Sequence, residues 1–306
     1  MKIILANPRG FCAGVNMAVS ALDKAVERFG TPFYVYHEIV HNNWVVESFR
    51  NLGVLFVDSL DVVPPGSRLM FSAHGVSPEI RRQAVLQNLY TIDATCPLVR
   101  KVHEEVIGFA KNGYKIILVG HPGHDEIVAV MSEAPDCTYL VATEADVDSL
   151  PDFETEKIAY VTQTTLSVDE AGKILGHLSV RFPHIVKPPS NDICYATQNR
   201  QDAIKKLAAL ADVVLVVGSC NSSNSRRLVE IARSITQKSY LIDGKDDIDP
   251  CIFAGSETVL VSAGASAPES VVQECVRFLV EKFDAAVEEQ IIHKETKRFA
   301  APEELR

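Results

Sequence analysis

Three segments of this chain share one arrangement, in which a strand-like run ends at a cysteine and a helical pattern follows. The cysteines are Cys12, Cys96 and Cys194. Two polar loops come after each cysteine, the first at 28 or 29 residues and the second at 62 to 72 residues, each directly behind an apolar run. The drift in the second interval is what loop insertions produce. The repeat therefore restricts the chain to three similar units, each of small-domain length.

Short Val- and Ile-rich runs alternate with longer amphipathic patterns along the chain. Runs such as Lys115–Val119 and Val213–Val217 are apolar on both faces, which is typical of parallel strands covered by helices on both sides. Residues 15–29 place apolar side chains on one helical face before Gly30, a C-cap residue. Pro97 suits the first turn of another helix, expected over residues 98–111. The sequence predicts an α/β fold.

We expect three α/β domains and a tail. The first covers residues 14–96 and the second 97–193, while the third joins the N-terminal strand, 1–13, to residues 194–284. Residues 285–306 are charged, lack periodicity and are expected to be a C-terminal tail.

Composition limits the partners and the location of the protein. A formal net charge of -10 argues against non-specific nucleic-acid binding. No apolar run is long enough to span a bilayer, and the start of the sequence lacks the features of a signal or transit segment. These features predict a cytoplasmic protein with neither a nucleic-acid nor a membrane partner.

Seven cysteines, an odd number in a long chain, make a disulfide framework improbable. A single cysteine is more often a small buried hydrophobe than a ligand, and only the repeat position distinguishes Cys12, Cys96 and Cys194. Thiolates hold iron–sulfur clusters, usually four to a cluster. Three thiolates leave one iron open, which is what a catalytic site requires. The remaining cysteines, Cys137, Cys220, Cys251 and Cys275, have no repeat equivalents, and Cys220 differs from the others in standing in a polar loop.

The polar loops combine imidazole, hydroxyl and amide groups with predicted helix N-termini, a combination that binds phosphate. Ser, Thr and Asn are also ordinary N-caps, but capping explains one residue of the run Ser222–Ser225 and not four. Glu126 stands beside His124 and is interpreted as a proton donor paired with it, although glutamates are common in first helical turns. The candidate catalytic residues are Glu126, His124 and Thr164. The candidate substrate-binding residues are His41, His74, His124, Thr164, Ser222, Ser223, Asn224 and Ser266.

Several common catalytic motifs are absent from the sequence. It contains neither the Gly-rich dinucleotide fingerprint nor a P-loop, and it has no nucleophile elbow. An enzyme that uses NAD, ATP or a serine nucleophile in the usual way is therefore disfavoured.

Six motifs, in this order along the chain, resemble the 4-hydroxy-3-methylbut-2-enyl diphosphate reductase family, also called IspH or LytB. The resemblance extends from about Met1 to Phe283, and Cys220 and the C-terminal tail depart from it. The motifs are Asn7–Val15, Asp93–Val99, Thr162–Ser167, Asp192–Thr197, Asn221–Ser225 and Ala263–Pro268.

This resemblance implies a pseudo-threefold trefoil of three α/β domains around one [4Fe-4S] cluster. It implies reductive dehydration of 4-hydroxy-3-methylbut-2-enyl diphosphate to isopentenyl and dimethylallyl diphosphate, the last step of the non-mevalonate isoprenoid pathway. It also implies that flavodoxin or ferredoxin supplies the electrons. By matching position, Cys12, Cys96 and Cys194 would hold the cluster. Glu126 would deliver a proton, with Thr164 orienting the substrate hydroxyl. The diphosphate would be held by His41, His74, His124, Ser222, Ser223, Asn224 and Ser266.

Three other classes of protein remain open on the residues alone. An iron–sulfur hydro-lyase acting on a phosphorylated small molecule would remove water without an external reductant. An iron–sulfur carrier or redox sensor has no need of three histidines and a Ser-Ser-Asn run in one cleft. A zinc-bound structural protein would lack the brown colour of an iron–sulfur cluster.

Overall fold

The computed structural model describes residues 1–153 and 157–306 and contains three parallel β-sheets with helices packed on them. The sheets confirm the predicted α/β class. The chain divides into two compact units, which are described separately below. The first unit consists of Met1–Asn16, Val40–Phe49 and Tyr195–Arg298; the second consists of Met17–Ile39, Arg50–Cys194 and Phe299–Arg306.

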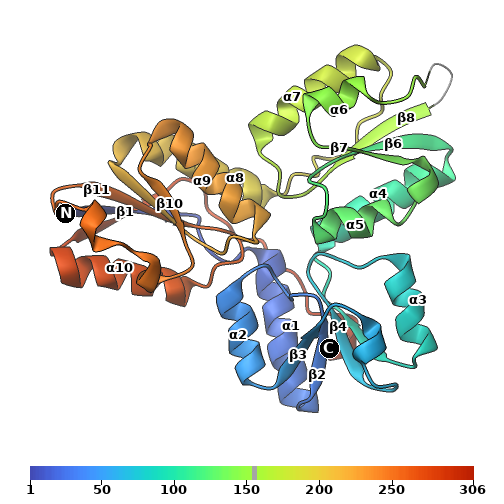
Figure 1. Cartoon of the computed structure of the whole chain (residues 1–306), viewed down its shortest axis with the longest axis horizontal. Coiled ribbons are helices and arrows are strands. Elements are labelled where there is room, and N and C mark those ends of the chain that lie inside the picture. The colour runs from blue at the N-terminus through green and yellow to red at the C-terminus, as the bar shows by residue number, and fades with distance from the viewer. Residues whose placement is uncertain (154–156) are drawn as a thin grey trace. The chain divides into compact units, whose positions relative to one another are not determined.

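The first unit is built on one five-stranded sheet, ordered β10-β9-β11-β1-β12, with every neighbouring pair parallel. Helices α8 and α9 cover one face of this sheet and α10 covers the other (Figure 1). Alternate residues of β9 enter two different cores, Val213 and Leu215 facing one and Val214 and Val216 the other. The elements are β1 (Lys2–Asn7), α2 (Asn43–Asn51, whose last two residues belong to the second unit), α8 (Tyr195–Leu207), β9 (Val213–Val217), α9 (Ser223–Ile235), β10 (Ser239–Ile242), β11 (Thr258–Ala263), α10 (Glu269–Phe283) and β12 (Ala286–Ile291).

The second unit contains two smaller parallel sheets, ordered β3-β2-β4-β5 and β7-β6-β8. Helices α6 and α7 pack on one face of the three-stranded sheet, and α4 and α5 pack on the other. The elements are α1 (Ala13–Phe29, which begins in the first unit), β2 (Phe33–Tyr36), β3 (Val54–Val57), β4 (Arg68–Phe71), α3 (Pro78–Leu86), β5 (Tyr90–Asp93), α4 (Pro97–Lys111), β6 (Tyr114–Val119), α5 (Asp125–Met131), β7 (Thr138–Val141), α6 (Glu144–Asp148), β8 (Lys157–Thr162) and α7 (Val168–Arg181).

Local sequence signals explain where the helices start and stop. The hydroxyl of Ser77 caps α3, and the hydroxyl of Ser167 caps α7. Gly30 follows α1 with φ +72°, the left-handed conformation expected of a C-cap glycine. Pro97 opens α4, so the helix predicted over 98–111 is confirmed with one extra residue.

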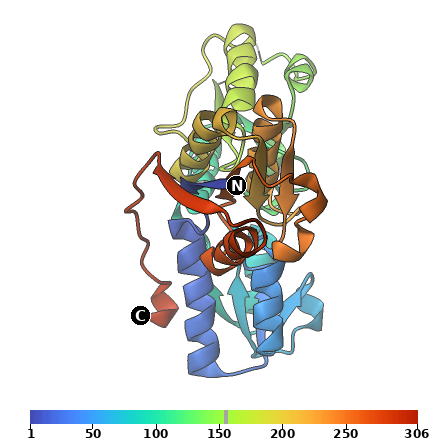
Figure 2. The same ribbon diagram turned by 90° about the vertical axis from the view of Figure 1, so that its left-hand side faces the viewer.

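The segment expected to be a tail begins with a strand. β12 pairs in parallel with β1, from Lys2 beside Ala286 to Asn7 beside Ile291. Five of its six side chains are exposed, and Glu288 forms an ion pair with Lys2 at 2.8 Å. Charged side chains are common on edge strands because they discourage further pairing. Such a strand lacks an alternating apolar pattern, so the sequence does not predict it. Residues 292–302 then follow without helix or strand, up to the 3-10 turn Glu303–Leu305 (Figure 2).

Two of the three expected domains contain one whole sheet each, whereas the sheet of the third extends into the expected tail through β12. The four-stranded sheet falls within 14–96 and the three-stranded sheet within 97–193, although residues 154–156 lie outside the described residues. The five-stranded sheet combines β1 with strands from the last third of the chain. The three-domain division itself stays a prediction. In residues 1–153 and 157–306, no helix has both the length and the apolarity needed to cross a membrane.

Candidate active site

Apart from Cys194, the residues predicted to form the site lie in loops or first helical turns that follow parallel strands, where ligands bind in α/β sheets. Cys194 instead follows α7 and a loop, so the strand-like run expected to end at this cysteine is not a strand in the structure. They fall into two groups, one in each unit. The first unit holds Cys12, His41, Ser222, Ser223, Asn224 and Ser266, and the second holds His74, Cys96, His124, Glu126, Thr164 and Cys194.

Hydroxyl groups from two loops meet in the first unit. Ser222 is the N-cap of α9, and its Oγ accepts a hydrogen bond from Ser225 N at 3.3 Å. The Ser266 hydroxyl donates to the carbonyl of His41 at 2.9 Å and lies 3.4 Å from Ser222 Oγ. The structure thus brings together the predicted residues Ser222 and Ser266 and the backbone of the predicted residue His41.

Two glycines allow these loops to approach one another. A Cβ at Gly264 would lie 2.0 Å from Ser225 Oγ, and one at Gly218 would lie 2.3 Å from the same atom. Only a residue without a side chain fits at either place. Asn224 then joins the loops, because its Oδ1 accepts from Ala265 N at 2.9 Å.

Asn224 also offers a donor for a ligand. Its Nδ2 is buried and has no hydrogen-bond partner among the described residues. Buried polar atoms in native structures are nearly always hydrogen-bonded. An oxygen of a bound anion would satisfy this amide, at the N-terminus of α9 where backbone N–H groups also favour anions.

Cys12 stands where β1 gives way to α1. Its backbone N–H donates to Ala265 O at 3.1 Å, and its Sγ accepts from Val15 N at 3.5 Å. The next residue, Ala13, donates its N–H to the Tyr195 hydroxyl at 3.3 Å. A sulfur that faces N–H groups at a helix start is well placed to act as a thiolate ligand.

In the second unit, Glu126 and Thr164 form a buried pair. Glu126 Oε1 accepts from Thr164 N at 2.7 Å, and the Thr164 hydroxyl donates to Oε2 at 2.8 Å. Glu126 is 2% exposed, and this burial raises its pKa above the usual range, while the two bonds from Thr164 act in the opposite direction. Burial therefore favours the protonated carboxyl, which is the form that a proton donor needs.

His124 and His74 lie near one another in the same unit. His124 is the N-cap of α5, and its Nδ1 accepts from Glu126 N at 3.2 Å. In the neutral ring this places the proton on Nε2. The ring of His74 meets that of His124 edge to face, with centroids 6.0 Å apart.

Cys96 and Cys194 occupy positions like that of Cys12. Cys96 is the N-cap of α4 and donates its N–H to Ala73 O at 3.0 Å, and Cys194 donates its N–H to Thr164 O at 3.0 Å. All three cysteines are half-buried, and none of the seven cysteines, all within the described residues, is in a disulfide. Three thiols at equivalent helix starts are a suitable donor set for an iron–sulfur cluster.

Sequence reasoning missed several residues that support the site. His37 Nδ1 lies 3.0 Å from Asp125 Oδ1, and this hydrogen bond raises the pKa of His37. Gln163 Oε1 accepts from His121 N at 3.0 Å. These residues stand in or next to the polar loops that the repeat identified, but their partners are distant in sequence, and no local pattern reveals such pairs.

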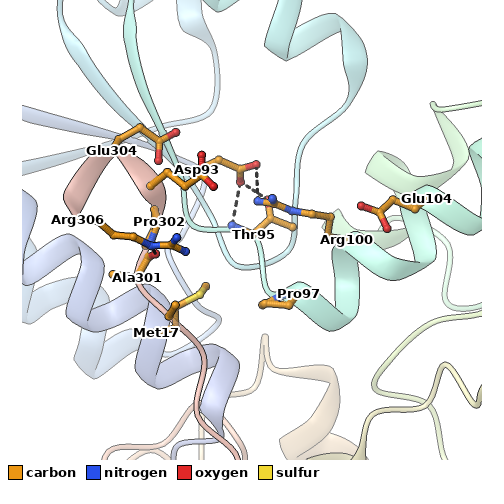
Figure 3. A pocket seen from close by; sticks show the side chains of 12 residues that line it. Met17, Asp93, Thr95, Pro97, Arg100, Glu104, Ala301, Pro302, Glu304 and Arg306 are labelled. Carbon is orange, nitrogen blue, oxygen red and sulfur yellow. Dashed lines mark hydrogen bonds and ion pairs between the residues drawn. The ribbon is translucent and has the colours of Figure 1, made fainter.

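A pocket lies in the second unit, between residues 300–306 and the start of α4 (Figure 3). Its volume is about 430 Å³, and Thr95 and Pro97, the two neighbours of Cys96, are among its lining residues. Asp93 accepts from Thr95 N at 2.9 Å and from Arg100 at 3.0 Å. None of the predicted site residues lines this pocket, so it is not the predicted substrate site.

Known proteins resemble this chain over its full length. The family model described as "LytB protein" matches residues 3–280. A 4-hydroxy-3-methylbut-2-enyl diphosphate reductase of Rhodopirellula baltica is 56% identical over 306 residues, covering 100% of this chain and 96% of the relative. The reductase of that name from Hahella chejuensis is 51% identical, covering 100% and 98%.

A solved structure also has the same fold. The E-1-hydroxy-2-methyl-but-2-enyl-4-diphosphate reductase of Plasmodium falciparum has a TM-score of 0.96 and 39% identity, covering 99% of this chain and 96% of the solved chain. The parallel sheets and these matches place the chain among α/β oxidoreductases. More narrowly, the chain belongs to the LytB family.

Proposed function

We propose that the chain reduces 4-hydroxy-3-methylbut-2-enyl diphosphate to isopentenyl and dimethylallyl diphosphate, the last step of the non-mevalonate pathway. In this reaction the carbon–oxygen bond to the hydroxyl breaks, two electrons and two protons enter, and water leaves. The match to the LytB family over residues 3–280 carries the proposal. The buried Glu126–Thr164 pair supports it, because the reaction needs a positioned proton donor.

We propose that Cys12, Cys96 and Cys194 hold a [4Fe-4S] cluster with one open iron site. Each of these thiols is half-buried, and each directly precedes or caps a helix. When bound, the cluster supplies the electrons and a Lewis acid for the substrate hydroxyl.

The diphosphate is proposed to bind through neutral groups. Asn224 Nδ2 and the hydroxyls of Ser222 and Ser223 supply donors in the first unit, and the Ser266 hydroxyl does so once it turns away from the carbonyl of His41. The imidazoles of His41, His74 and His124 are proposed to supply the others. His124 and Ser222 are the N-cap residues of α5 and α9. A phosphate bound by them would lie at a helix N-terminus, where the partial positive charge favours an anion.

The proton path proposed here begins at Glu126. Its buried carboxyl is held in one orientation by both bonds from Thr164, so a proton on Oε1 or Oε2 is presented from a fixed position. The Thr164 hydroxyl, hydrogen-bonded to Oε2, can accept from the acid and donate to a substrate oxygen. Flavodoxin or ferredoxin as electron donor, and a cytoplasmic location, stay predictions.

A reductant-dependence assay tests the proposal. The protein is purified without oxygen and given 4-hydroxy-3-methylbut-2-enyl diphosphate with dithionite and a viologen, and the products are identified. We expect both isopentenyl and dimethylallyl diphosphate, with two electrons consumed per molecule. Loss of water from the substrate without any reductant would instead establish a hydro-lyase.

A further inference from the structure

We infer that Asp192 is a positioning residue for Cys194, and this inference rests on the proposed cluster site. Asp192 stands two residues before Cys194, and its side chain is fully buried. Its Oδ2 accepts from the backbone N–H of Thr162 at 2.8 Å, and its Oδ1 accepts from Lys101 Nζ at 2.5 Å. A buried carboxylate is tolerated only with such partners, so both bonds fix its place.

The bond to Lys101 attaches the Cys194 segment to the helix that begins at Cys96. Lys101 lies in the second turn of α4, whose N-cap is Cys96. The same ammonium donates to the carbonyl of Ser190 at 3.0 Å, so it holds the approach to Cys194 at two points. The Lys101–Asp192 pair therefore helps to set the separation of two proposed cluster ligands within the second unit.

The bond to Thr162 aligns the same segment with the end of β8. Two residues further along each segment, Cys194 N donates to Thr164 O at 3.0 Å. The stretch from Asp192 to Cys194 thus follows the chain from Thr162 to Thr164, and Thr164 in turn holds Glu126. Displacing Asp192 would shift the cysteine ligand and the carbonyl that orients it.

Residues that orient a ligand affect the metal site as well as the fold. Mutating such outer groups typically lowers metal affinity or activity by about 10- to 100-fold. Asp192→Asn removes the charge that pairs with Lys101, while Lys101→Met removes the donor and keeps the aliphatic stem. Lys101→Met also removes the bonds from this ammonium to the Ser190 carbonyl and to Glu105. If Asp192 acts through its bond to Lys101, the double variant is therefore no worse than Lys101→Met alone.

The test uses the cluster-loaded protein, with Asp192→Asn, Lys101→Met and the double variant compared with wild type. Iron release to a chelator is followed by loss of visible absorbance, and the reduced cluster is examined by electron paramagnetic resonance. We expect iron release about 10-fold faster in each variant, together with an altered resonance spectrum. The matched control is Glu104→Gln, an exposed residue on the same helix, which should behave as wild type.

A purely structural role gives a different result. In that case Asp192→Asn and Lys101→Met would lower the unfolding temperature of the cluster-free protein, yet leave the resonance spectrum and iron release unchanged, and the inference would be overturned. Lys101→Met decides the question if Asp192→Asn does not fold. A wild-type protein that assembles no cluster at all would overturn the proposed function, and this inference with it.

Discussion

Thr164 and Glu126 are joined by two hydrogen bonds, one from the backbone N–H and one from the hydroxyl, at 2.7 and 2.8 Å. The carbonyl of Thr164 meanwhile accepts from the N–H of Cys194. One residue therefore attaches the proposed proton donor to the backbone of a proposed cluster ligand. Proton donation and cluster binding can therefore be tested separately, because Glu126 can be changed without altering the hydrogen bond between Thr164 and Cys194.

Replacing Glu126 with Gln keeps the shape of the side chain and removes its acidic proton. We expect turnover to fall about 100-fold or more, since a positioned general acid typically contributes that much. Visible absorbance of the purified protein should be unchanged. Glu144→Gln, at an exposed site on α6, serves as the control. Wild-type turnover in Glu126→Gln would remove this residue from the mechanism.

Thr164→Val tests the role of the hydroxyl through pH dependence. Burial raises the pKa of Glu126, and the bonds from Thr164 lower it in part. An acid catalyst is active below its pKa, so turnover falls as pH rises through that value. Without the hydroxyl the pKa moves further up, and the falling limb of the kcat profile should shift to higher pH. A limb that stays in place or moves to lower pH would contradict this account.

Replacing a proposed ligand should release the cluster. We expect Cys194→Ser, purified without oxygen, to lose the visible absorbance and the bound iron of the wild-type protein. Cys251→Ser is the matched control, because Cys251 is exposed and has no equivalent in the repeat. Iron analysis and absorbance spectra measure both variants. Full iron content in Cys194→Ser would exclude the three-cysteine site.

Glu105 makes the stability of the cluster-free protein depend on pH. Burial and the neighbouring Asp192 raise its pKa to about 7, against a bond from Lys101 that lowers it. Between pH 4.5 and about 7 the folded state holds a proton on Glu105 that the unfolded state has released. The free energy of unfolding therefore falls as pH rises through this range. After allowance for its partial exposure, we expect Glu105→Gln to gain about 1 kcal/mol over wild type at pH 8. Urea unfolding at pH 5 and pH 8 measures the difference in the free energy of unfolding between Glu105→Gln and wild type. An equal difference at both pH values would contradict a raised pKa of Glu105.

Gly264→Ala tests the meeting of the two hydroxyl-bearing loops. The added Cβ would lie 2.0 Å from Ser225 Oγ, and overpacking of this kind typically costs about 1–3 kcal/mol. We also expect a higher KM, because the Ser222 and Ser266 loops must move apart. Gly172→Ala is the control, since Gly172 lies inside α7 with open space around its Cβ position, where alanine should stabilise by about 0.5–1 kcal/mol. An unchanged KM in Gly264→Ala would mean that these loops do not bind substrate.

The fold could be predicted from the sequence where burial leaves a pattern. Val213–Val217 is buried throughout and was recognised as a strand, and the helix ending before Gly30 was recognised from its apolar face and its cap. β12 was missed because an exposed edge strand has no such pattern. The pairing of β1 with strands near the end of the chain was likewise not visible in any local window.

The candidate site could be predicted as far as the repeat extends. Glu126 and Thr164 were both named, but the bond between them joins residues 38 positions apart and required the structure. Asp192 lay inside a recognised motif, whereas its partner Lys101, 91 positions away, had no feature that distinguished it from other helix lysines. Contacts of this kind depend on how the elements pack, and that information is not local.

The position of β1 between β11 and β12 has a consequence for synthesis. During synthesis, residues 2–7 have no permanent neighbouring strands until residues 258–291 have been made. The long continuous stretch of the second unit, from Arg50 to Cys194, is complete well before then. Pairing between strands that lie far apart in the sequence is slow, and an unpaired apolar strand is prone to aggregate. Residues 2–7 should therefore depend on chaperones during translation, and truncation before residue 286 should leave β1 with an open edge.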